Sequence, residues 1–111
     1  LDAGLQRFGK AVEAASLQKM LDLVAPSEQS APLLLNSLIS AVKEIQRMPS
    51  ASTTTHAVVS KQGNRAHTMV IYRAPGESPK SLRFLVQWKL SDGKWQVVPD
   101  TTSRGLKVIV Q

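Results

Sequence analysis

The stretch from residue 80 to residue 98 constrains the fold of this chain more than any other, because it describes a complete β-hairpin. Apolar and polar side chains alternate over residues 82–90, and this period of two puts one set on each face of a strand. Asp92 and Gly93 then supply the two positive-φ positions of a type I′ turn. The turn fixes a register in which Trp88, Trp95 and most large apolar residues share one face. The pairs that this register predicts are Ser91 with Lys94, Leu90 with Trp95, and Trp88 with Val97.

The length of the chain and its lack of cysteine limit what the fold can be. With 111 residues, we expect a single domain over residues 1–111 that builds one core without disulfides or a thiolate metal site. No apolar run approaches the roughly 18 residues of a membrane span. The first residue is Leu rather than Met, so we expect a trimmed or processed chain, consistent with export to the periplasm or secretion.

The net positive charge lies in the second half of the chain. Residues 1–49 carry five basic and five acidic side chains, whereas residues 50–111 carry nine basic and three acidic ones. A one-sided field of this kind attracts anionic partners, although solubility alone also explains it. One hypothesis is therefore an anion-binding surface centred on Arg83, Lys89 and Lys94.

The N-terminal half predicts three helices, over residues 2–15, 16–25 and 31–48. Ser16 has the position of an N-cap for the second helix, and Pro26 ends it. Gly4 and Gly9 weaken the first helix by about 1 kcal/mol each, so we expect another element to pack closely there. The residues that we expect on the buried side of the third helix are Leu35, Leu38, Ile39, Val42 and Ile45.

Two strands follow, over residues 54–61 and 65–74, and a last short strand covers residues 106–110. A turn centred on Gly63 and Asn64 predicts a simple register for the first two strands. The predicted pairs are Ser60 with His67, Val58 with Met69, and His56 with Ile71. We place Ala57, Val59, Thr68, Val70 and Tyr72 on the core side, because the opposite face carries Arg65 and Arg73, which are costly to bury unpaired.

The order of elements predicts an α+β fold with three N-terminal helices packed on a curved antiparallel sheet of four or five strands. This order and the segment WKLSDGKW at residues 88–95 resemble the nuclear-transport-factor-2-like superfamily, also called the cystatin-like cone. Members commonly open with a helix, a break and a second helix, here residues 8–24 with Ser16 at the break. They commonly close with a hairpin whose turn reads D-G-K/R-W, here residues 92–95.

The resemblance implies an apolar cavity inside the cone, between the third helix and the inner face of the hairpin. The residues expected to line it are Trp88, Trp95, Tyr72, Phe84 and Asp100. Both tryptophans have the alternative role of core packing. Enzymes of this group need a general base and a proton donor, which makes Asp100 and Tyr72 the candidates for a small lyase or isomerase. The alternative roles are a turn former for Asp100 and a core-edge residue for Tyr72.

Other chemistry has little support in the sequence. His56 and His67 lie about 13 Å apart in the predicted register, too far to share a metal ion. No glycine-rich phosphate loop or nucleophile elbow is present. Few aromatic residues remain for base stacking once those of the hairpin are buried, which argues against nucleic-acid binding. The sequence predicts neither a cofactor nor a metal.

The outward face of the predicted sheet suggests a protein interface. Its expected apolar residues are Val58, Met69, Ile71 and Leu85, a patch larger than a monomer usually exposes. We therefore expect a sheet-to-sheet homodimer or the docking of a partner domain. The function that the sequence favours is a non-catalytic binding or interaction module.

Overall fold

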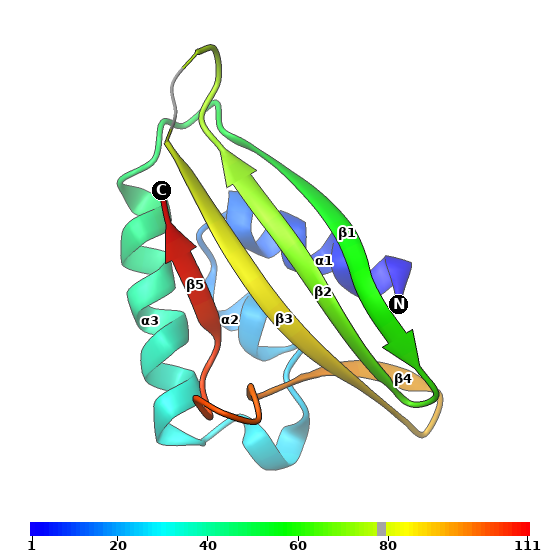
Figure 1. Cartoon of the computed structure of the whole chain (residues 1–111). Coiled ribbons are helices and arrows are strands. Elements are labelled where there is room, and N and C mark those ends of the chain that lie inside the picture. The colour runs from blue at the N-terminus through cyan, green and yellow to red at the C-terminus, as the bar shows by residue number, and fades with distance from the viewer. Residues whose placement is uncertain (78–79) are drawn as a thin grey trace.

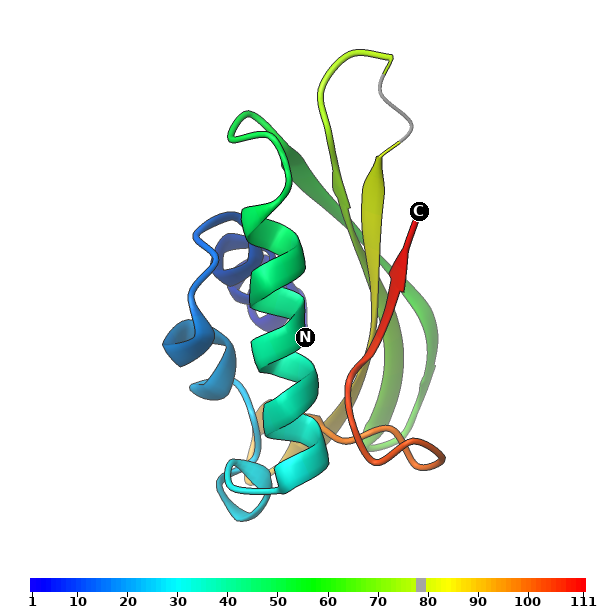
Figure 2. The same cartoon turned by 90° about the vertical axis from the view of Figure 1, so that its left-hand side faces the viewer.

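The computed structural model describes residues 1–77 and 80–111 and shows three α-helices packed on one face of a five-stranded antiparallel sheet (Figure 1). Figure 2 shows that the helices lie on one side of the sheet and leave the other side uncovered. The helical elements are α1 (Asp2–Glu13), α2 (Leu17–Leu21), the 3-10 helix η1 (Pro26–Glu28) and α3 (Pro32–Gln46). The strands are β1 (Thr53–Gln62), β2 (Arg65–Arg73), β3 (Ser81–Ser91), β4 (Lys94–Val98) and β5 (Lys107–Val110). The predicted α+β fold is confirmed.

The second helix begins as predicted but ends early. The Ser16 hydroxyl accepts a hydrogen bond from the Lys19 amide at 3.2 Å, which is the expected N-cap. The helix stops at Leu21 because the chain after it turns to pair with β4. The Val97 amide donates to the Leu23 carbonyl at 2.7 Å, and the Ala25 amide donates to the Val97 carbonyl at 2.9 Å. Residues 23–25, which the sequence assigns to the second helix, pair with a distant strand instead.

The third helix buries a face that differs in part from the expected one. Leu38 and Ile45 are buried as predicted, but Leu34 and Ala41 complete the buried row, while Ile39 is 36% exposed. The run of three leucines at its start fits more than one helical face, so the pattern alone does not fix its rotation. The positions of the sheet and α2 decide it.

Strand β3 is the centre of the sheet. One of its edges pairs with β2 along its length, and the other edge is divided between β4 and β5. The turn after β3 has positive φ at Asp92 (52°) and Gly93 (76°), and Trp88 lies opposite Val97, so the predicted hairpin register is confirmed.

Strands β1 and β2 depart from the predicted register at one residue. The pair Ser60 and His67 forms as expected, but a β-bulge between Val58 and Ser60 shifts every pair beyond it. Val58 lies opposite Thr68, and Ala57 lies opposite Met69. The predicted pairing of Val58 with Met69 is therefore wrong, because Val59 is an extra residue in the ladder. The inward side of β2 is as predicted, since Thr68, Val70 and Tyr72 are buried.

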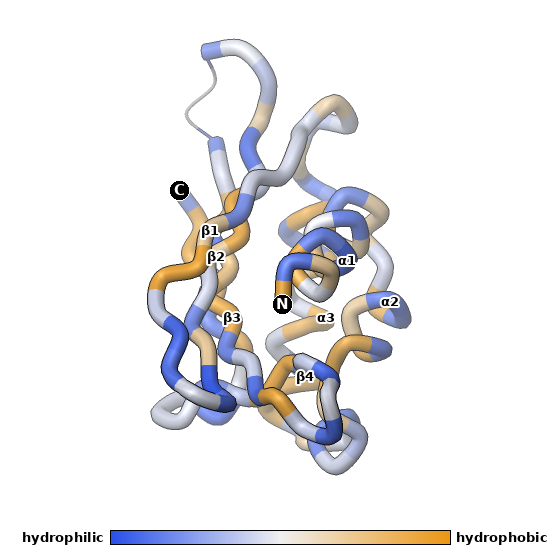
Figure 3. Tube along the Cα trace, turned by 90° about the vertical axis from the view of Figure 1, so that its right-hand side faces the viewer, coloured by the Kyte–Doolittle hydropathy of each residue, from blue (hydrophilic) through white to orange (hydrophobic). Residues whose placement is uncertain are grey.

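The core lies between the helices and the inner face of the sheet, and apolar residues are spread over both layers (Figure 3). Phe8 of α1 packs edge-on against Phe84 of β3, with ring centroids 5.8 Å apart. Gly4 has the close neighbour that its position predicts: a Cβ there would lie 2.9 Å from the Trp88 ring. A Cβ at Gly9 would lie 3.0 Å from the hydroxyl oxygen of Thr54. These glycines let α1 lie directly on the sheet.

Candidate functional site

Three of the five residues expected to line a cavity are packed in the core. Trp88 and Phe84 are fully buried, and Tyr72 is 4% exposed. The indole Nε1 of Trp88 donates to the Thr68 hydroxyl at 2.8 Å, and that hydroxyl donates to the Val86 carbonyl at 3.1 Å. These two hydrogen bonds satisfy the indole N–H of Trp88 and the hydroxyl of Thr68, as buried positions require. Trp88 has the core-packing role that the sequence left open.

Trp95 lies at the end of the inner face, where it is only partly buried. The Lys61 ammonium group sits 5.7 Å from the centroid of its ring. A cation at this distance from an exposed indole contributes about 0.5–1 kcal/mol. The contact ties the tip of the β1–β2 hairpin to β4, so a structural role accounts for Trp95.

Asp100 organises the loop between β4 and β5. Its carboxylate accepts hydrogen bonds from the amides of Thr102 at 3.1 Å and Ser103 at 2.8 Å, and from the side-chain amide of Gln87. Its backbone amide donates to the Gly105 carbonyl at 2.9 Å. These bonds use both carboxylate oxygens, which matches the turn-forming role considered above.

The structure does not bring the candidate acid–base pair together. Tyr72 is buried on the inner face opposite Leu82. Asp100 bonds to Gln87, which lies five positions further along β3, or about 16 Å. Gln87 is also on the opposite face, because side chains alternate along the strand and its neighbour Trp88 points inward. No proton relay joins groups placed in this way.

Asp100 gives the loop a defined pH dependence. Hydrogen bonds from the Ser103 and Thr102 amides, with a contribution from the charge of Lys107, hold the pKa of Asp100 below its ordinary value of 3.8. A depressed folded-state pKa means that the ion stabilises the fold above the unfolded value, and that this stability is lost as pH falls through the folded-state pKa. We expect Asp100→Asn to lower the melting temperature at neutral pH.

Thermal unfolding of both proteins followed by circular dichroism between about pH 7 and pH 2 checks this, and the gap should close in the acid range. A gap of constant size at every pH would mean that the charge of Asp100 contributes nothing.

The face of the sheet that points away from the helices is called the outer face below. Register places Ile71, Arg83 and Ile109 in one row across it, and Met69, Leu85 and Lys107 in the next row. The four apolar side chains of these rows are partly exposed and form what we call the outer-face cluster: Met69, Ile71, Leu85 and Ile109.

The membership of this cluster differs from the predicted patch. The bulge in β1 removes Val58, whose partner Thr68 is buried on the inner face. Ile109 takes its place, because β5 pairs with β3 in a register that its short sequence did not reveal. Met69, Ile71 and Leu85 share the outer face as expected.

Arg83 lies within the cluster and has an unusual environment. Its Nε atom is buried and has no hydrogen-bond partner among the described residues. None of the five described strands contains an aspartate or a glutamate. The outer face is therefore apolar at its centre, basic around it, and free of carboxylates on its strands.

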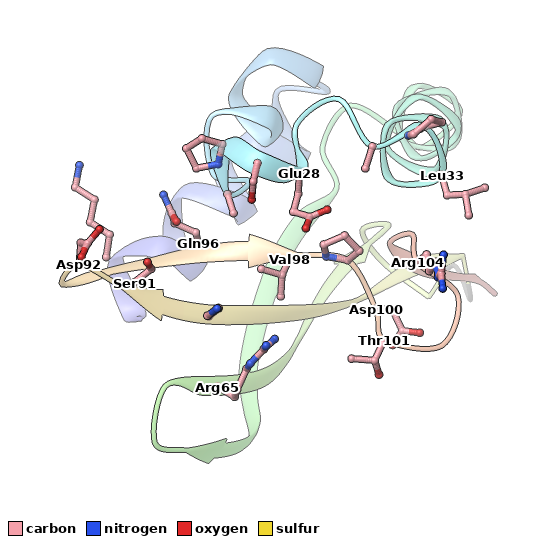
Figure 4. Close-up of a pocket in the computed structure, with 18 residues that line it drawn as sticks. Glu28, Leu33, Arg65, Ser91, Asp92, Gln96, Val98, Asp100, Thr101 and Arg104 are labelled. Atoms are coloured by element: carbon pink, nitrogen blue, oxygen red, sulfur yellow. The ribbon is translucent and has the colours of Figure 1, made fainter.

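A groove of about 1000 Å³ lies at the end of the sheet beside β4 and is called the β4 groove (Figure 4). One wall is formed by η1 and the first residues of α3, and the other by β3, β4 and the loop after β4. Asp92 marks one end and Arg104 the other, with Glu28 across β4 from Arg65 (Figure 4). Its basic side chains are Arg65, Lys89, Lys94 and Arg104, and its acidic ones are Glu28, Asp92 and Asp100.

Of the five residues predicted to bind a ligand, only Asp100 lines the β4 groove in the described part of the chain. A smaller depression of about 310 Å³ between α3 and β5 includes none of the five. Arg65 and Arg104 were missed because nothing local in the sequence shows that the first residue of β2 and a residue of the loop after β4 line one groove.

Within residues 1–77 and 80–111, the two histidines do not lie side by side in the sheet. His67 lies on the outer face opposite Ser60, and His56 pairs with the inner-face residue Val70, so the bulge places the two histidines on opposite faces of the sheet. No cluster of three metal-binding side chains occurs among these residues. None of their helices has both the length and the apolar character needed to cross a membrane.

Comparison of the chain with protein-family models, curated proteins and solved structures finds no match. The resemblance to the nuclear-transport-factor-2-like superfamily therefore stays a prediction from the sequence.

Proposed function

We propose that this protein is a non-catalytic interaction module that forms a homodimer through the outer faces of its two sheets. The observation that carries the proposal is the outer-face cluster, which spans three neighbouring strands and which no helix covers. A contiguous apolar area on an otherwise polar surface is typical of an interface.

The charges around the cluster give this dimer a recognisable salt dependence. Arg73, Arg83 and Lys107 flank the apolar side chains, and no carboxylate on the strands offsets them. Two such faces repel each other, and dissolved ions screen that repulsion over about 10 Å at 0.1 M salt. Apolar burial does not weaken with salt in this range. We therefore expect dimerisation to strengthen as salt is added.

Sedimentation velocity over a range of protein and salt concentrations tests the proposal. Ile71→Lys puts a charge into the cluster and should weaken the dimer by about tenfold or more, which is 1.4 kcal/mol. The matched control is Ile39→Lys, the same change at an exposed position of α3, and it should leave the dimer intact. A wild-type protein that stays monomeric at high concentration in high salt would overturn the proposal.

The rival function of a small lyase or isomerase lacks support from the arrangement of the side chains, because Asp100 and Tyr72 lie on opposite faces. A small apolar ligand in the core would have to displace Trp88 or Phe84, both fully buried. The interaction module requires neither an acid–base pair nor an internal cavity, and it is the function that the uncovered face supports.

A further inference from the structure

The cations of the β4 groove have no ion-pair or side-chain hydrogen-bond partner in the described part of the chain. Arg65, Lys89, Lys94 and Arg104 are exposed, and none of them is in an ion pair or a side-chain hydrogen bond among residues 1–77 and 80–111. Of the three carboxylates in the groove, Asp100 is already bonded to its own loop. The groove therefore has an excess of unpaired positive charge beside a concave surface.

The cations are spread along the groove rather than gathered at one point. Lys94 begins β4, whereas Arg104 lies in the loop beyond its end. The five residues of β4 span about 13 Å, and Arg104 lies beyond them. One phosphate group contacts donors only within about 3 Å of its oxygens, so it cannot bridge them. An extended chain of about five residues with several negative charges has the right length.

The uncharged residues of the β4 groove indicate which kind of extended ligand fits it. Leu33 is 55% exposed and lies in the groove with Pro32 and Val98, which offers an apolar contact between the charged ones. No aromatic side chain is among the lining residues described, so the groove has no platform on which a nucleobase could stack. An acidic peptide with an apolar residue fits these features better than a nucleic acid.

The loop that holds Arg104 is fixed before any ligand binds. The Arg104 amide donates to the Asp100 carbonyl at 2.8 Å, and Arg104 takes a left-handed conformation with φ of 60°. The carboxylate of Asp100 accepts hydrogen bonds from the amides of two of the three residues between them, Thr102 and Ser103. A pre-formed loop lowers the entropy that binding would otherwise cost.

From these observations we propose that the β4 groove binds an extended acidic peptide segment of a partner protein, with Arg65, Lys89, Lys94 and Arg104 pairing with its carboxylates. This goes beyond the proposed dimer and does not depend on it. Arg65 and Lys89 pair at the far end of the outer face, and Lys89 lies about 13 Å along β3 from Leu85, where the outer-face cluster ends.

Fluorescence anisotropy with a short labelled peptide of glutamates around a central leucine tests the proposal. Binding should weaken several-fold between about 50 and 200 mM salt, because screening reduces charge pairing. This trend is opposite to the one expected for the dimer, so the failure of one proposal is distinguishable from the failure of the other. A matched peptide of lysines around leucine should not bind.

Two double variants with the same change in net charge locate the site. Arg65→Glu with Lys89→Glu should reduce affinity for the acidic peptide by about tenfold or more. Lys10→Glu with Lys43→Glu, on exposed positions of α1 and α3, should change it less than about threefold. Circular dichroism and melting temperatures establish that all variants are folded.

Three outcomes would overturn the proposal. The acidic peptide does not bind the wild-type protein; both double variants lose affinity equally, which would indicate attraction to net charge alone; or inorganic tripolyphosphate binds in the groove where the peptide does not, which would assign the cations to a phosphate ligand.

Discussion

Trp88→Ala should remove a large part of the free energy of unfolding of the domain. Trp88 is the largest fully buried side chain. It belongs to the central strand β3, and its ring packs against α1 at Gly4. Truncating a buried tryptophan costs about 3–5 kcal/mol through lost burial and the cavity left behind. A domain of this size has only about 5–15 kcal/mol of stability. Urea unfolding followed by far-ultraviolet circular dichroism measures the loss without using the tryptophan signal.

The second tryptophan is the control for this result. Trp95→Ala removes the same side chain from a partly exposed position and a weak contact with Lys61. Its cost should be well below that of Trp88→Ala, at about 1–2 kcal/mol. Equal losses for the two variants would mean that α1 is not held by the Trp88 ring.

Thr68→Val is expected to destabilise the domain by about 1–3 kcal/mol, although the new side chain has nearly the same shape. The Thr68 hydroxyl accepts from Trp88 Nε1 and donates to the Val86 carbonyl in a site that is 2% exposed. Valine keeps the volume but leaves the indole N–H buried without an acceptor, and that desolvation is not repaid.

Thr68→Ser separates the hydroxyl from the methyl group. Serine keeps both hydrogen bonds and loses one buried methyl, which costs about 1 kcal/mol. Serine should therefore be better tolerated than valine when the free energies of unfolding of the two variants are compared in urea. The reverse order would show that packing at Thr68 outweighs the polar chain.

The hairpin of β3 and β4 was predictable because its structure is encoded locally. Alternating side chains fix the faces, and the Asp92–Gly93 turn fixes the register, without reference to the rest of the chain. The same holds for the Ser16 cap, whose partner lies one helical turn away. Local rules were sufficient wherever the partners are neighbours in sequence.

The features that were missed depend on partners far away in the chain. The bulge at Val59 leaves no sign in an alternating pattern, since one extra residue only exchanges the faces beyond it. Residues 23–25 continue the helical pattern in the sequence, but in the structure they form backbone hydrogen bonds with β4. The outer-face cluster was three-quarters predictable, because only the exchange of Val58 for Ile109 needed the register of two other strands.

The backbone bonds of residues 23–25 to β4 bear on how the protein emerges from the ribosome. The segment between α2 and η1 leaves the exit tunnel long before Val97 is translated, and so do Gly4 and Phe8, whose contacts lie on β3. Synthesis therefore produces a group of helices with exposed apolar sides and no sheet to cover them. The helices can dock only after the last third of the chain, which supplies β3 and β4, has been synthesised. Until then their exposed apolar sides make the nascent chain prone to aggregate.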